Sequence, residues 1–216
     1  MNANAGQAQP VVFVVDDDVA VRDGVSSLLR SVGMRTEVFA SPEELTARGT
    51  LALANCLVLD VRLPGISGLE FQRELNAQAS QTPIIFITGH GDVPMSVRAM
   101  KAGAVEFLLK PFREQELLDA VQQAIQIDRE RRREEAKLAE LRERFALLTV
   151  REREVMENLV AGQLNKQIGE AIGAAESTIK AHRAQMMRKM QAGSLPELVR
   201  MADRLGVGLP PDATRT

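Results

Sequence analysis

The chain has 216 residues, of which 45% are hydrophobic and 26% charged, and its formal net charge is −2, a composition that suits a soluble protein with real cores. The single Cys56 excludes an internal disulfide, and no apolar run approaches the roughly 18 residues needed to span a bilayer. Residues Met1 to Gln9 lack the basic and apolar regions of a signal peptide, so we expect a cytoplasmic protein without a membrane partner.

Five apolar runs in the first half of the chain predict β-strands, and the segments between them have helical spacing. Ser41 to Glu44 has the pattern of a helix start, with a capping Ser, Pro in the first turn and Glu three residues after the Ser. Near-continuous apolar strands that alternate with helices imply a parallel sheet covered on both faces. We therefore expect a (βα)₅ doubly wound α/β domain at residues 10–127, after a disordered N-terminus at 1–9. The predicted strands are Val11–Val15, Thr36–Phe39, Leu57–Leu59, Ile84–Ile87 and Val105–Leu109.

The next predicted helix begins near Arg113 and has no obvious stop, because Gly and Pro are absent from Arg113 to Ala161. Within it, apolar residues follow one another at spacings of 3, 4 and 3, as in the seam of a coiled coil. A seam this short leaves two interpretations of residues 128–147 open. They form a solvated helical linker, or a linker that also pairs two chains. The seam residues are Leu138, Leu141, Phe145 and Leu148.

The last part of the chain has the pattern of four short helices. Capping-box patterns at Thr149 to Glu152 and at Ser194 to Glu197 predict the starts of the first and the fourth. Gly162, Gly173 and Gly193 are expected to end the first three. A Gly turn between the second and third helices is typical of a helix-turn-helix. We expect an all-α domain at residues 148–207 and a flexible tail at 208–216.

Polar side chains follow several of the predicted strands. Asp16 and Asp17 follow the first, Asp60 the third, Thr88 the fourth and Lys110 the fifth. Ligands bind at the carboxyl ends of the strands in open α/β sheets, and carboxylate oxygens suit Mg²⁺. Each residue also has a simpler interpretation, which is a solvated acidic loop, a strand-end hydroxyl or an ordinary ion pair. Their combination favours a cation or phosphoryl site, and the acidic balance of residues 1–127, with 15 acidic and 10 basic residues, agrees with it.

These motifs resemble the receiver domain of two-component response regulators of the FixJ/NarL family, and most closely its FixJ-like subgroup. The resemblance implies that Asp60 accepts a phosphoryl group from a sensor histidine kinase. It also implies that Asp17 and Asp60 bind Mg²⁺ directly, that Asp16 acts mainly through water, and that the backbone carbonyl of Arg62 completes the ligands. The motifs that carry it are Val14–Asp18, Leu59–Gly65, Ile87–Met95 and Met100–Phe112.

The same resemblance assigns roles to three further residues. Lys110, aimed by a cis bond before Pro111, would neutralise the phosphoryl charge. Thr88 would donate a hydrogen bond to the phosphoryl group, and Phe107, the family's switch aromatic, would fill the space that Thr88 vacates. The alternative is that Phe107 is an ordinary core residue. The helix from about Val93 to Ala102 and the last strand would then form the face of a phosphorylation-dependent homodimer.

The C-terminal part resembles a LuxR-type DNA-binding domain. The resemblance implies that its third helix, from about Ser177 to Met190, enters the major groove of double-stranded promoter DNA. It also implies that the protein regulates transcription, with activation as the expected direction and RNA polymerase as a partner. A solvated basic face is the simpler interpretation of this helix. Expected groove residues are Ser177, Thr178, Lys180, Ala181 and Ala184, and expected phosphate contacts are Lys166, Arg183 and Arg188.

Two departures from the LuxR-type pattern predict a less stable domain. Ala174 and Ala175 stand where a Ser or Thr usually caps the third helix, and the loss of that cap costs on the order of 1 kcal/mol. Gly169 replaces a usual Ala in the second helix, at a cost of up to ~1 kcal/mol.

We expect a phosphorylation-controlled transcription factor that is not an enzyme. Two other functions are alternatives to it. One is a phosphatase of the dehalogenase-like class, which also uses an Asp nucleophile at the end of a strand. That class has a second Asp two residues later, where this chain has Arg62. The other is a receiver whose degenerate output domain acts through protein contacts.

Overall fold

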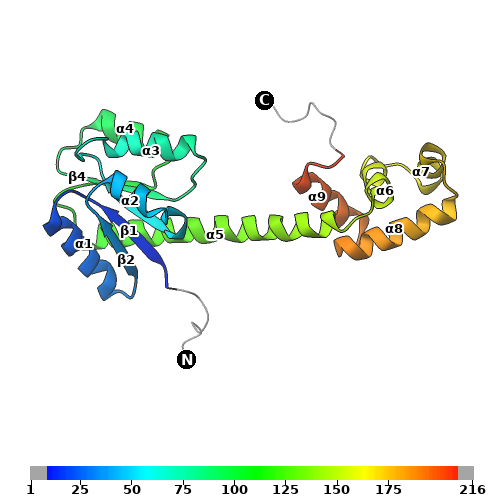
Figure 1. Cartoon of the computed structure of the whole chain (residues 1–216), viewed down its shortest axis with the longest axis horizontal. Coiled ribbons are helices and arrows are strands. Elements are labelled where there is room, and N and C mark those ends of the chain that lie inside the picture. The colour runs from blue at the N-terminus through cyan, green and yellow to red at the C-terminus, as the bar shows by residue number, and fades with distance from the viewer. Residues whose placement is uncertain (1–8, 209–216) are drawn as a thin grey trace. The chain divides into compact units, whose positions relative to one another are not determined.

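The computed structural model describes residues 9–208 (Figure 1). The chain divides into two compact units at the junction of Arg132 and Arg133, and each unit is described here by itself. The N-terminus and tail that were expected to be disordered lie outside the described residues, apart from Gln9 and Gly208.

The first unit is a five-stranded parallel sheet with the strand order β2-β1-β3-β4-β5, as the alternating pattern predicted. Its strands are β1 Val11–Val15, β2 Arg35–Phe39, β3 Cys56–Asp60, β4 Ile84–Thr88 and β5 Glu106–Leu109. Its helices are α1 Val19–Ser31, α2 Pro42–Arg48, α3 Gly68–Ala77, α4 Val93–Lys101 and the start of α5 Glu114–Ala146, with a short 3₁₀ turn η1 at Leu51–Leu53. Asp60 and Thr88 are the last residues of their strands rather than the residues that follow them.

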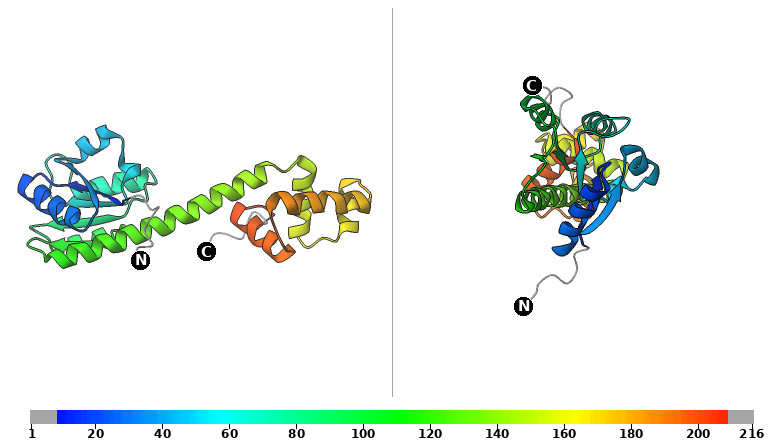
Figure 2. Two further views of the ribbon diagram at one scale, coloured as in Figure 1. Left: turned by 90° about the horizontal axis from the view of Figure 1, so that it is seen from below. Right: turned by 90° about the vertical axis from the view of Figure 1, so that its left-hand side faces the viewer.

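Two hydrophobic cores lie on opposite faces of this sheet, because side chains alternate between the faces of a strand. Phe13 and Leu57 belong to one core, and Val12 and Val58 belong to the other. Helices α2, α3 and α4 cover the first face of the sheet, and α1 and α5 cover the second (Figures 1 and 2). Both faces are therefore covered, which explains why the central strands read as continuous apolar runs.

The buried Asp128 fixes α5 to the end of the sheet opposite the carboxyl ends of the strands. Its side chain is fully inaccessible and pairs with Arg131 and, at 2.6 Å, with Arg132. Asn55 donates to the same carboxylate at 2.7 Å and accepts from the amide of Val11 at 2.8 Å. The turn of α5 after residue 127, interpreted from the sequence as the start of a solvated linker, therefore packs against the first unit.

The second unit consists of the end of α5 and four further helices. These are α6 Val150–Val160, α7 Asn165–Ile172, α8 Glu176–Met190 and α9 Leu195–Leu205. The seam residues Leu141 and Leu148 are buried in its core, and Phe145 packs against that core. The sequence left pairing of two chains through this seam open. In the structure Leu141 and Leu148 are used within one chain, so pairing through them would require the core to open, whereas the half-buried Leu138 is not part of that core.

Two helix ends of the second unit differ from the sequence expectation. Helix α8 ends at the left-handed Gln191, with φ of 56°, rather than at Gly193. The expected capping box before α9 is incomplete, since Ser194 accepts from the Glu197 amide but the Glu197 carboxylate accepts from Gly193. The box at Thr149 and the missing side-chain cap at Ala175 are as predicted.

A steric contact, which the sequence did not reveal, explains why position 169 is a glycine. A Cβ at this position of α7 would lie 2.6 Å from the carbonyl oxygen of Ala174, a distance that real Cβ atoms essentially never show. The amide of Ala174 donates to the Gly169 carbonyl at 2.9 Å, which holds the turn close to the helix. The prediction that Gly169 weakens the domain is therefore wrong, because the close turn between α7 and α8 excludes the usual Ala.

We expect Gly169→Ala to lower the free energy of unfolding of the second unit by about 1–3 kcal/mol, because backbone must move to admit the methyl group. Gly24→Ala in α1 is the matched control, since an added Cβ there has no neighbour within 4 Å. The free energy of unfolding of this control should rise by about 0.5–1 kcal/mol. The chain lacks Trp and Tyr, so hydrogen exchange during denaturant unfolding is the suitable measurement for each unit. An equal or higher stability of the second unit in Gly169→Ala would contradict this explanation.

Candidate functional site

Three carboxylates meet at the carboxyl edge of the sheet. The register of β1 with β3 places Val15 beside Leu59, so the residues that follow them, Asp16 and Asp60, are neighbours. Ligand oxygens of Asp16, Asp17 and Asp60 lie within 4.8 Å of one another. Asp16 is fully buried, Asp60 is 6% exposed and Asp17 is exposed. The structure therefore brings together the acids that the sequence predicted.

Lys110 joins two of these acids. Its Nζ lies 2.5 Å from Oδ2 of Asp16 and 3.0 Å from Oδ2 of Asp60. Burial alone would lower the pKa of Lys110, but its hydrogen bonds to the two carboxylates outweigh burial and raise it. The bond between Lys110 and Pro111 is cis, as expected. The ammonium thus remains charged beside Asp60, where it can neutralise an incoming anion.

The remaining oxygens of the two buried acids accept hydrogen bonds from the backbone. Oδ1 of Asp16 accepts from the amide of Asp18 at 3.0 Å, and Oδ1 of Asp60 accepts from the amide of Arg62 at 3.1 Å. Burial raises the pKa of Asp16, although the hydrogen bonds from Lys110 and Asp18 act in the opposite direction. A divalent cation fits this site, because hard oxygens of three carboxylates converge on it. The single positive charge of Lys110 neutralises only part of their negative charge.

We expect Asp16→Asn, measured without Mg²⁺, to abolish the part of the pH dependence of stability that comes from Asp16. A raised folded-state pKa means that the wild type loses stability as pH rises from the ordinary value of 3.8 through that higher pKa. The amide variant cannot ionise, so this loss should disappear. Hydrogen exchange across this pH range measures the difference. Asp17→Asn, at an exposed position, should keep the pH dependence of the wild type; an Asp16→Asn variant with that same pH dependence would contradict the argument.

Thr88 is the last residue of β4, and Phe107 lies in the neighbouring strand β5, close to the loop that follows β4. Thr88 is fully buried, and its Oγ1 accepts from the amide of His90 at 3.3 Å. Phe107 is half-buried in β5, packs on the core and has its ring centroid 6.2 Å from that of Phe86. A Cβ at Gly91 would lie 2.9 Å from Phe107, so this glycine lets the loop approach the ring. The sequence did not single out Gly91, since only the tertiary contact reveals its role.

Most residues that the sequence assigned to DNA contacts are exposed on α7 and α8. Ile179, Met186 and Met190 are buried in the core, as predicted. The following residues of α7 and α8 are exposed: Lys166, Ser177, Thr178, Lys180, Ala181, Ala184 and Arg188.

The three expected cations of α8 already have partners, which the sequence did not indicate, and Arg188 donates to Gln185 Oε1 at 2.7 Å. Arg183 is half-buried and donates to Asn165 Oδ1 of α7 at 3.4 Å. Lys180 pairs with Glu176 at 3.0 Å, and Glu176 is an exposed acid in the first turn of the helix.

Comparisons with known proteins identify both units. Residues 12–122 match the response regulator receiver domain family, and residues 146–202 match the family of bacterial regulatory proteins, luxR family. Nodulation protein W of Bradyrhizobium diazoefficiens is 50% identical over 197 residues, with 91% of this chain and 87% of that protein covered. The transcriptional regulatory protein FixJ of Azorhizobium caulinodans is 45% identical, with 95% and 97% covered.

The solved structures agree with these relatives. The structure of response regulator StyR is 47% identical and superimposes with a TM-score of 0.77 over 91% of this chain and 100% of that chain. No helix within residues 9–208 is long and apolar enough to cross a membrane. The receiver fold with its acidic edge and the luxR-family helical domain together identify the protein family. This chain belongs to the two-component response regulators, and it is a transcriptional regulator whose receiver is a phosphoacceptor and whose second domain is a LuxR-type helix-turn-helix that binds DNA.

Proposed function

We propose that Asp60 is the phosphoacceptor of this regulator and that its phosphorylation controls DNA binding by the second domain. The observation that carries the proposal is the contact of Lys110 with Asp60 at 3.0 Å, beside Asp16 and Asp17 and at the same edge as Thr88. A carboxylate that attacks an anionic phosphoryl group requires nearby positive charge, and Lys110 supplies it.

The proposed reaction is a phosphoryl transfer from a sensor histidine kinase. An oxygen of Asp60 forms a bond to phosphorus while the bond from phosphorus to the kinase histidine breaks. We assign Mg²⁺ binding to Asp17, Asp60 and the carbonyl of Arg62, with Asp16 acting through water; when bound, the ion supplies further charge neutralisation. Asp60 holds the product as an acyl phosphate, and Lys110 pairs with it.

The proposed switch follows the loop after β4. Thr88 can donate its hydroxyl to a phosphoryl oxygen once that group is present, and Phe107 can then move into the space left by Thr88. The face of α4 and β5 carries exposed apolar side chains, including Val93 at 75%, Leu109 at 54% and Val97 at 44% exposure. We propose that two phosphorylated chains pair through this face, because burying such side chains stabilises a dimer.

The proposed output is regulation, in the activating direction, of a promoter in the cytoplasm with RNA polymerase as partner. Ser177, Thr178, Lys180, Ala181 and Ala184 are assigned to the major groove because they are exposed near the N-terminal part of α8. Lys166, Arg183 and Arg188 are assigned to phosphates. The proposed domain bounds are 10–127 and 148–207, although the receiver unit of the structure extends through Arg132.

Incubation with acetyl phosphate and Mg²⁺ tests the phosphoacceptor. Intact mass spectrometry should show a single added phosphoryl group on the wild type and none on Asp60→Asn. Asp23→Asn, at an exposed position of α1, is the matched control and should be modified like the wild type. Equal modification of Asp60→Asn and the wild type would contradict the assignment of Asp60.

A further inference from the structure

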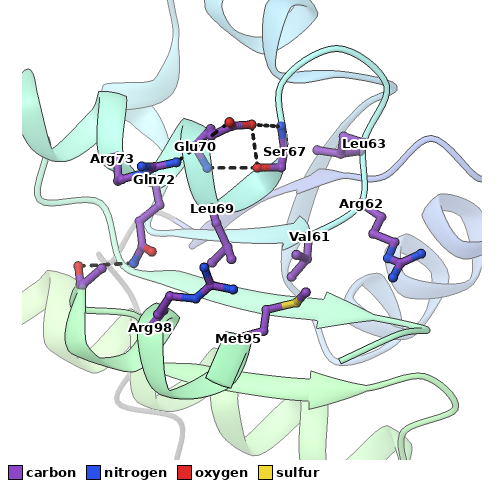
Figure 3. A pocket seen from close by; sticks show the side chains of 11 residues that line it. Val61, Arg62, Leu63, Ser67, Leu69, Glu70, Gln72, Arg73, Met95 and Arg98 are labelled. Atoms are coloured by element: carbon purple, nitrogen blue, oxygen red, sulfur yellow. Dashed lines mark hydrogen bonds and ion pairs between the residues drawn. The ribbon is translucent and has the colours of Figure 1, made fainter. Parts of the chain in front are cut away.

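A cavity of about 650 Å³ lies between α3 and α4, and Arg62 is the residue that it shares with the proposed Mg²⁺ ligands of the acidic site. Its apolar part is formed by Val61, Leu69 and Met95, which come from the loop after β3, from α3 and from α4 (Figure 3). This volume is in the range of sites for small molecules, which are mainly apolar with a few polar groups.

Three arginines and one acid, Glu70, are the charged groups that line this cavity. Arg98 reaches from α4 toward Leu69 of α3 (Figure 3). Only its Nε has a hydrogen bond, to the Pro94 carbonyl at 3.4 Å, and among the described residues no acid pairs with Arg98 or with Arg62, which also lines the cavity. Arg73 has a distant partner in Glu70, at 3.9 Å. The cavity therefore offers unpaired guanidinium groups beside an apolar surface.

Gln72 adds a buried polar group. It is only 2% exposed, and its amide nitrogen donates to the carbonyls of Ala99 at 3.4 Å and Ala102 at 3.2 Å. These two bonds tie α3 to the last turn of α4 along the wall of the cavity.

We propose that this cavity binds a small amphipathic anion, with its apolar body against Leu69 and Met95 and its carboxylate or comparable group on Arg98. The loop wall of the cavity begins at Val61, directly after Asp60, and the opposite wall is α4, which follows the Thr88 loop. A bound anion bridges these two walls. It thereby changes the rate at which Asp60 is phosphorylated, a consequence that rests on the proposed function.

Binding of 1-naphthoate to the unphosphorylated full-length chain tests the site. Methyl resonances of Leu69 and Met95 should shift in a saturable manner, and the neutral 1-naphthalenemethanol should bind more weakly. Arg98→Ala should weaken naphthoate binding about tenfold or more, because a charge-assisted hydrogen bond is lost. Arg113→Ala, which removes an exposed arginine outside the cavity, is the matched control and should bind as the wild type does. Unshifted methyl resonances, or equal affinity in Arg98→Ala, would overturn the proposal.

The regulatory part is measured by the rate of phosphorylation with acetyl phosphate, with and without saturating naphthoate. We expect the rate to change in the wild type and to be insensitive to naphthoate in Arg98→Ala. An unchanged rate in the wild type with naphthoate bound would overturn the coupling. Absence of phosphorylation without naphthoate would instead contradict the function proposed for Asp60, while the methyl shifts still report on the cavity.

Discussion

Replacing Lys110 with alanine is expected to slow phosphorylation of Asp60 by acetyl phosphate by about 10²–10³-fold, since the site loses a preorganised cation next to the reacting carboxylate. In the structure Lys110 Nζ lies 3.0 Å from the Asp60 carboxylate, and the ammonium is held there by Asp16. The initial rate of phosphoprotein formation, followed by intact mass spectrometry, measures the effect.

Lys101→Ala is the matched control, because Lys101 is an exposed lysine at the end of α4 in the same domain. It should be phosphorylated at the wild-type rate. Hydrogen exchange of Lys110→Ala establishes that the sheet remains folded. A folded Lys110→Ala protein that is phosphorylated as fast as the wild type would show that Lys110 has no role in charge neutralisation.

Replacing Asp128 with alanine is expected to lower the free energy of unfolding of the receiver by about 3 kcal/mol or more, because removal of one partner leaves buried charge and hydrogen-bond donors unsatisfied. Asp128 is fully buried and accepts from Asn55, Arg131 and Arg132. Arg132 also donates to the carbonyl groups of Ala52 at 2.8 Å and Ala54 at 3.0 Å. The variant should therefore also expose the amides of α5 after residue 127 to exchange.

The matched control is Asp119→Ala, since Asp119 lies on the exposed side of the same helix. Its change in stability should stay within about 0.5 kcal/mol. Denaturant unfolding with hydrogen exchange of the receiver amides gives both values. Equal stability of the two variants would mean that the Asp128 network does not hold α5 against the sheet.

The sequence predicted the receiver fold well because each central strand is a short apolar run that is buried on both faces. Val11–Val15 and Ile84–Thr88 differ from their surroundings in composition alone, without reference to any distant contact. The same holds for the location of Asp16, Asp60, Thr88 and Lys110, since the ends of parallel strands meet at one edge of the sheet.

Features that depend on tertiary contacts were predicted less well. The Leu141 and Leu148 seam has the spacing of a coiled coil, but the same spacing also suits a helix that completes the core of its own domain. Gly169 looked like a weak helix residue until the position of the Ala174 carbonyl was known. Asp128 lay in a run of charged residues, and no local pattern distinguishes its buried carboxylate from the exposed ones.

The central claim is that phosphorylation of Asp60 controls DNA binding by the LuxR-type domain. Its most direct test is the affinity of the full-length chain for genomic fragments that it selects, measured with and without acetyl phosphate and Mg²⁺ at one fixed salt concentration. We predict that phosphoryl donor raises the affinity of the wild type, leaves Asp60→Asn unchanged, and that Lys180→Ala binds weakly under both conditions. Equal affinity of the phosphorylated and unphosphorylated wild type for every selected fragment would contradict the claim.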